Sequence, residues 1–177
     1  MAVQIGAKPD SGFDDPLGML KDCHRRIEMF LGILCRVAER GESGSLNDEE
    51  QTAVQAALHY FREGGQRHTA DEEESLFPRL KDSRAPGFDA LDRLEDDHRD
   101  ANKLHAAIER LFSAWIASGS ISPEDRQSLL STAHRLRTLY TGHIRVEEEN
   151  VFPYAARVLD SGRIREIGTE FRARRSS

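Results

Sequence analysis

One stretch of this chain occurs twice, 75 positions apart, and it constrains the fold more than any other feature. The copies begin at His68 and His143, and both follow the pattern His-x-x-x-Glu-Glu-Glu-x-aliphatic-Phe-Pro. Because residues four apart share one face of an α-helix, each copy sets an imidazole beside a carboxylate, Glu72 or Glu147. Three acidic residues in a row disfavour a purely structural helix, since neighbouring like charges repel. The repeat therefore indicates a functional site.

The chain around these copies reads as helices. Asp15-Pro16, Asn47 with Glu50, and Ser122-Pro123 are helix-start patterns, and apolar residues recur near helical period after them. A proline cannot continue the helical hydrogen-bond ladder, so we expect each Phe-Pro to end its helix. The expected helices cover residues 16–40, 47–76, 88–118 and 122–151, with a tail over 163–174 after a break near Ser161-Gly162.

Short links between four long helices make neighbouring helices antiparallel. The expected fold class is all-α: an up-down-up-down four-helix bundle with a short C-terminal helical tail. A length of 177 residues suits one domain. We expect a flexible N-terminal lead over residues 1–13 and the bundle domain over residues 14–174.

Two further histidines follow the same internal repeat. His24 and His98 are 74 positions apart, so the first pair of helices resembles the second pair. Stacking the pairs about a pseudo-two-fold axis brings both His-x-x-x-Glu faces and both single histidines to one centre. The predicted metal-site residues are His24, His68, Glu72, His98, His143 and Glu147.

Four imidazoles and two carboxylates in a bundle core need a cation, because buried charges must be paired or bound to a metal. Nitrogen and oxygen ligands suit borderline first-row metals such as iron, zinc or manganese. A symmetric set indicates two metals, about 3.5–4 Å apart. If each glutamate bridges both, about one coordination position per metal remains open for a small ligand.

Composition excludes several other classes of protein. A net charge of −6 argues against a nucleic-acid partner, because phosphate contacts need a basic surface. No apolar run approaches the roughly 18 residues that span a bilayer, and the first residues lack a signal-peptide pattern. Cys23 and Cys35 lie twelve apart on one expected helix, too far to bridge. We interpret both as reduced thiols in a cytoplasmic protein.

The order His, His-x-x-x-Glu, His, His-x-x-x-Glu, closed twice by Phe-Pro, resembles the hemerythrin-like HHE cation-binding proteins over about residues 15–173. Ferritin-like di-iron proteins use Glu-x-x-His instead. The resemblance implies two iron ions with an oxo or hydroxo bridge, and small oxygen or nitrogen oxide ligands. It implies a sensor, a buffer or a catalase-like enzyme that handles peroxide, oxygen or nitric oxide.

One position departs from the family pattern. Oxygen-carrying hemerythrins have another histidine one turn after the first on the third helix, where this chain has Asn102. This difference argues against simple oxygen carriage. Two alternatives remain: a non-catalytic protein that stores or carries iron or oxygen, and a helical interaction module whose metal is only structural.

Other polar residues near the motifs have plainer interpretations. The motif residues themselves have the alternative of a solvated polar face, and His24 and His98 that of core histidines. We expect Gly64 and Gly65 either to weaken a long helix or to open a small cavity that Tyr140 faces. We expect a surface or supporting role for Glu28, a supporting or core-edge role for His105, outward-facing rings for His59 and His134, and solvent or arginine contacts for Glu73, Glu74, Glu148 and Glu149.

Overall fold

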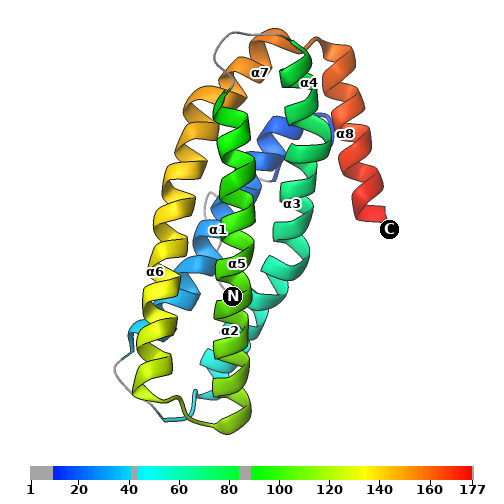
Figure 1. Ribbon diagram of the computed structural model, residues 1–177. Helices are drawn as coiled ribbons and strands as arrows, with labels where there is room; N and C mark the ends of the chain where they lie inside the picture. Colours follow the sequence, from blue (N-terminus) through cyan, green and yellow to red (C-terminus); the bar gives the residue numbers. More distant parts are fainter. Residues whose placement is uncertain (1–9, 41–43, 84–88, 177) are drawn as a thin grey trace.

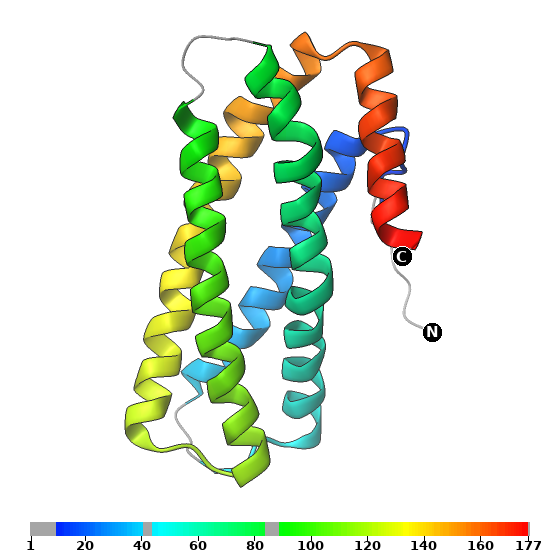
Figure 2. The same cartoon turned by 45° about the vertical axis from the view of Figure 1, so that its right-hand side comes forward.

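The computed structural model describes residues 10–40, 44–83 and 89–176, apart from the side chain of Asp89. These residues form helices and no strand. Figures 1 and 2 show long helical rods side by side, with a shorter helix against their outer surface. The predicted all-α bundle with a C-terminal helical tail is therefore confirmed.

Two of the rods are interrupted by π-helical segments. The first rod is α1 (Pro16–Glu39), and the third is α5 (Asp89–Ser118). The second comprises α2 (Asp48–Tyr60), π-helical η1 (Phe61–Gly65), α3 (Gln66–Ala70), π-helical η2 (Asp71–Leu76) and α4 (Phe77–Asp82). The fourth comprises α6 (Pro123–Val146), π-helical η3 (Glu147–Val151) and α7 (Phe152–Val158), and the outer helix is α8 (Ser161–Ser176).

The predicted helix starts are present. Asp15 accepts a hydrogen bond from the Gly18 amide, 3.0 Å. Asn47 and Glu50 form a reciprocal capping box, with bonds of 2.8 and 2.9 Å. Ser122 caps α6 through the Asp125 amide, 3.0 Å. These caps satisfy backbone N–H groups that have no partner within the helix.

The prediction that Phe-Pro ends each helix was wrong. Pro78 and Pro153 lie in the first turn of α4 and α7, and the rods continue past them. The first turn is where proline is tolerated, because its missing N–H has no intrahelical role there. The chain breaks later: Leu159 is extended, and the carboxylate of Asp160 accepts a bond from the Arg163 amide, 2.9 Å. The break thus precedes the expected Ser161-Gly162.

The apolar core has two parts, one near each end of the bundle. The larger part includes Phe112 and Trp115, and the smaller includes Phe77, Phe152 and Phe171. Phe171 and Ile167 of α8 are fully buried, so the tail is part of the packed fold. Five of the six predicted metal-site residues lie between the two clusters along their rods, and the sixth, His143, directly precedes Ile144 of the larger cluster.

Of the expected lead, residues 10–13 are described, and 1–9 lie outside the described residues. Phe13 packs beside the smaller core cluster, and the Ser11 amide donates to Asp22, 2.5 Å. A Cβ on Gly168 of α8 would lie 1.9 Å from the Phe13 carbonyl oxygen. The absence of a side chain at Gly168 therefore permits this close approach.

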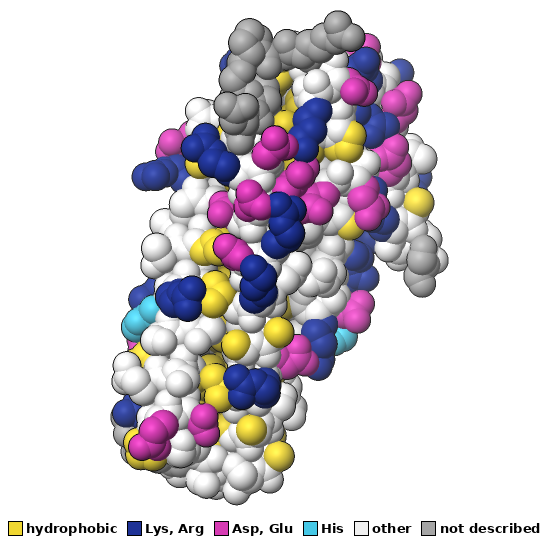
Figure 3. Space-filling view, in the orientation of Figure 1, with side chains coloured by type: hydrophobic (Ala, Val, Ile, Leu, Met, Phe, Trp, Pro, Cys, Tyr) yellow, Lys and Arg dark blue, Asp and Glu magenta, His cyan; other side chains and the backbone are white. Residues whose placement is uncertain are grey.

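Among the described helices, none is long and apolar enough to cross a membrane. The face seen in Figure 3 carries acidic side chains gathered in its upper half, with lysines and arginines between them.

Cys23 and Cys35 are both free and buried, as expected.

Candidate metal centre

The structure brings all six predicted metal-site residues together inside the bundle. They form two groups, within each of which one ligand atom per residue lies within 4.8 Å of the others. Each side chain is between 0% and 5% exposed. Both groups contain the same two glutamates. The first group is His24, His68, Glu72 and Glu147, and the second group is Glu72, His98, His143 and Glu147.

The two carboxylates connect the halves of the chain. Within each motif, His68 Nε2 lies 3.5 Å from Glu72 Oε1, and His143 Nε2 lies 3.2 Å from Glu147 Oε1. The second oxygen of each glutamate faces the single histidine of the other half. Glu147 Oε2 is 3.0 Å from His24 Nε2, and Glu72 Oε2 is 3.3 Å from His98 Nε2. Each glutamate therefore lies between two imidazoles.

The next glutamate of each motif supports the same single histidine. Glu148 is 2.8 Å from His24 Nδ1, and Glu73 is 2.8 Å from His98 Nδ1. Successive side chains diverge less in a π-helix, which closes its bonds over five residues, and η2 and η3 hold these glutamate pairs. Glu73 and Glu148 thus do more than the solvent or arginine contacts expected of them.

A carboxylate that accepts from Nδ1–H leaves the Nε2 lone pair of a neutral imidazole pointing inward. This applies to His24 and His98, and more weakly to His143, whose Nδ1 is 3.4 Å from Asp97. His68 Nδ1 has no such partner among the described residues. The internal repeat explains this difference between His68 and His143. The position that matches Asp97 in the first half, 74 residues earlier, is Cys23, which has no carboxylate.

The phenylalanines of the motifs hold the same histidines from one side. Phe152 stacks on His24 with ring centroids 5.4 Å apart, and Phe77 lies parallel to His98 at 6.3 Å. Both phenylalanines are buried. The Glu-Glu-x-x-x-Phe part of each copy therefore supports the lone histidine of the other half, a role that the pattern of one copy alone does not indicate.

The electrostatics of the site follow from burying two carboxylates beside imidazoles. Burial, with the charge of Glu147, raises the pKa of Glu72 well above its ordinary value. Burial also favours protonation of Glu147, but His143 and His24 outweigh it and hold its pKa below the ordinary value. Burial lowers the pKa of His68 far below its usual range. The protein alone therefore favours a proton on one carboxylate, the position that a cation would take.

The donor set fits a bound cation. Both carboxylate oxygens of Glu72 and of Glu147, and His24 Nε2, are buried without a well-formed hydrogen bond among the described residues. His98 Nε2 and His143 Nε2 are 3.1 Å apart. Buried polar atoms in folded proteins are almost always satisfied. This many converging acceptors without partners therefore indicates a bound metal ion as their partner.

Most other predictions for nearby residues agree with the structure. Glu28, His59 and Glu149 are exposed. His134 bonds to Glu39 at the surface, 2.8 Å, and Glu74 pairs with Arg174, 3.2 Å.

The glycine pair separates two hollows. Gly65 and Tyr140 line a small space beside His98, as the cavity prediction proposed. Gly64 instead lines a hollow on the other side, where a Cβ would lie 2.7 Å from the Tyr60 ring. His105 is half-buried and bonds Tyr140, so it has the supporting position expected of it.

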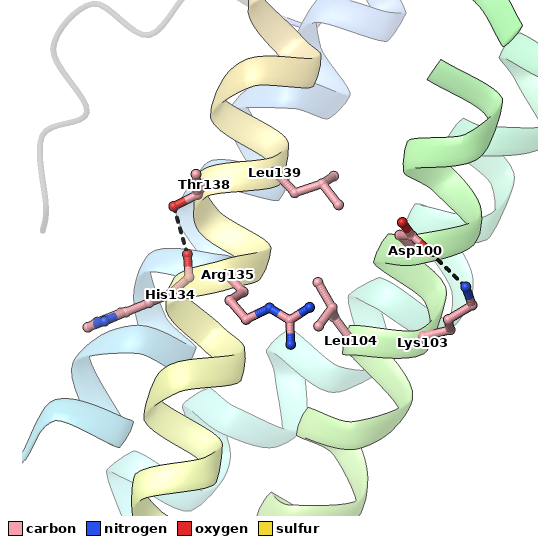
Figure 4. A pocket seen from close by; sticks show the side chains of 7 residues that line it. All are labelled: Asp100, Lys103, Leu104, His134, Arg135, Thr138 and Leu139. Atoms are coloured by element: carbon pink, nitrogen blue, oxygen red, sulfur yellow. Dashed lines mark hydrogen bonds and ion pairs between the residues drawn. The ribbon is translucent and has the colours of Figure 1, made fainter. Parts of the chain in front are cut away.

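A larger hollow, about 680 Å³, lies away from the metal-site residues, between α5 and α6. Figure 4 shows Arg135 of α6 directed toward Leu104 of α5, while His134 points away from the hollow. None of the six converging residues lines it. The buried cluster, and not this hollow, is therefore the candidate functional site.

Comparison with known proteins supports this identification. The family profile of the hemerythrin HHE cation-binding domain matches residues 15–155, which contain all six residues and exclude α8. No match was found among curated proteins. The family match covers well over half of the chain, and the matched range carries a buried cluster of histidines and glutamates fit for a cation. The chain belongs to the hemerythrin HHE cation-binding domain family.

Proposed function

We propose that the protein binds two iron ions and handles small oxygen species: peroxide, oxygen or nitric oxide. The observation that carries the proposal is the pair of four-residue groups that share Glu72 and Glu147. His24 and His68 would hold one ion, His98 and His143 the other, with both glutamates common to the two. When bound, such an ion pair supplies redox chemistry toward these small molecules.

The protein's own contribution is to orient the ligands and keep water away. Glu73 and Glu148 hold the imidazoles of His98 and His24 with Nε2 directed inward. Phe77 and Phe152 cover these two rings on one side. Burial of all six side chains strengthens their electrostatic attraction for a cation.

The test is metal content with a matched pair of variants. Protein from iron-rich medium should contain about two irons per chain, and its optical spectrum should change with oxygen. Glu147→Gln should lose iron, whereas Glu149→Gln, two positions along and exposed, should keep it. Well under one metal per chain in the natural protein, or equal loss in both variants, would refute the assignment.

Turnover separates the remaining functions. Consumption of peroxide supports a catalase-like or detoxifying role, and iron binding without turnover supports storage or carriage. Zinc that restores stability and all cellular function would support the structural-metal alternative. We favour oxygen chemistry over oxygen carriage because of position 102, where oxygen-carrying hemerythrins have a fifth histidine. Here that position is Asn102, whose exposed side chain bonds to Gln66. Two free, buried cysteines favour a reducing compartment, the cytoplasm.

A further inference from the structure

A small enclosed space adjoins His98 on the side of α3 and η1. Its volume is about 10 Å³, close to the least that holds one water molecule. The lining residues are Phe61, Gly65, Gln66, Thr69, His98, Ala101, Asn102, His105 and Tyr140. We call this space the chamber. Among the metal-site residues, only His98 of the second group borders it.

An outer groove of about 290 Å³ lies against the chamber. The two spaces share four lining residues, Phe61, Gln66, Asn102 and His105, which therefore form the wall between them. Gln66 Nε2 donates to Asn102 Oδ1 across this wall, 3.0 Å. Gln66 and Asn102 are both exposed, so this bond can open toward water without moving a buried group.

The chamber exists because two positions carry little side chain toward it. Gly65 has none, and a Cβ there would lie 3.6 Å from Phe61 Cδ1, an ordinary contact. Asn102, one turn after His98, carries a short amide directed to Gln66. A larger group at Gly65 would therefore reduce the chamber without straining the backbone.

The lining of the chamber is part polar and part apolar, and no lysine, arginine, aspartate or glutamate belongs to it. Tyr140 Oη and His105 Nε2 are hydrogen-bonded, 2.9 Å. Burial lowers the pKa of His105 to about 4, so this imidazole is neutral at physiological pH. Thr69 adds a hydroxyl. An ion entering so small a space would lose its hydration without gaining a counter-charge.

We propose that the chamber is the binding site for one neutral molecule of about the size of water, and that the Gln66–Asn102 bond is its gate. This inference rests on the proposed function, because it names the molecules that would reach the metal position held by His98 and His143. Among the proposed ligands, oxygen, nitric oxide and hydrogen peroxide are small and neutral, whereas azide is an anion.

The first test needs no metal. A high-resolution crystal structure of metal-free protein should show one ordered water in the chamber, and Gly65→Ala should show none. Gly142→Ala is the matched control, because it makes the same change in a helix where a Cβ would meet nothing within 4 Å. A dry chamber in the natural protein, or a retained water in Gly65→Ala, would contradict the site.

The second test measures ligand binding rates on iron-loaded protein by stopped-flow spectroscopy. Gly65→Ala should slow nitric oxide binding at least about tenfold, and Gly142→Ala should not. Gln66→Ala should speed nitric oxide binding about fivefold, because breaking one hydrogen bond takes about 1 kcal/mol and 1.4 kcal/mol is tenfold. Exposed Gln55→Ala is its control.

The outcomes are distinguishable. Rates equal in all variants, with iron content unchanged, would overturn the gate and leave the proposed function standing. A natural protein without bound iron would overturn the proposed function, while the crystallographic water would still report on the chamber. Azide faster than nitric oxide in the natural protein would contradict the selection for neutral molecules.

Discussion

The C-terminal helix should brace one metal-binding segment through a buried carboxylate. Asp71, next to Glu72, is fully buried, and two arginines of α8 hold it. Arg174 Nη1 donates to Asp71 Oδ1, 2.9 Å, and Arg175 Nη2 to Oδ2, 2.6 Å. Arg174 also donates to Ser75 Oγ, 2.8 Å. These contacts fix η2, the segment that presents Glu72.

Removing both arginines leaves Asp71 buried without a counter-charge, a loss of about 3–5 kcal/mol. For a protein of this size, that lowers the melting temperature by roughly 6–20 °C. Asp71→Ala should be milder, about 1.5–3 kcal/mol. Arg174 and Arg175 are only 19% and 24% exposed, but their guanidinium groups can still turn to water. The double arginine variant should therefore lose more stability than Asp71→Ala, because it leaves a buried charge without a partner and Asp71→Ala does not.

The assay is thermal and urea unfolding of metal-free protein, followed by iron content. The control for Arg174→Ala/Arg175→Ala is Arg163→Ala/Arg165→Ala, which removes the same charge from exposed positions of the same helix. The control should lose less than about 1 kcal/mol. Equal losses in the two double variants would refute the brace, as would an Asp71→Ala variant less stable than Arg174→Ala/Arg175→Ala.

Three further changes probe the site. Asn102→His places an imidazole at the chamber wall and should slow peroxide consumption at unchanged iron content. Glu73→Gln removes the carboxylate that orients His98 and should weaken iron binding about 10- to 100-fold in chelator competition, whereas Glu149→Gln should not. Burial lowers the pKa of His105 from its ordinary 6.5 to about 4, so the unfolded chain takes up the proton first. Stability should therefore fall as pH drops from 6.5 to 4, by up to about 3 kcal/mol, and His105→Gln should lose that part of the acid dependence in urea unfolding at pH 7 and pH 4.5.

The residues that sequence reasoning placed correctly are those fixed by helical spacing and internal repetition. The four-residue interval in each motif sets His68 beside Glu72 because that interval is one helical turn. The repeat then brings His24 and His98 to the same centre. The cap residues Asn47 and Ser122 follow local rules, so they also could be read directly.

What the sequence did not reveal depends on non-local structure. The π-helical turns before Pro78 and Pro153 let the rods continue, and no local pattern distinguishes such a turn from a helix end. Glu73 looks like part of a solvated acidic run until the neighbouring α5 sets His98 against it. Asp71 likewise looks exposed, and only the docking of α8 buries it.

The repeat also explains why the two metal positions would differ. Crosswise support from Glu73 and Glu148 is equal in the two halves. Three features break the symmetry. Asp97 accompanies His143, whereas Cys23 stands in the matching place near the other half. The brace by α8 holds the Glu72 segment alone, because the position matching Asp71 is Val146. The chamber adjoins His98 and not His24. Of these three features, only the chamber offers small molecules a way to approach. We therefore expect the metal position held by His98 and His143 to be the one that reacts.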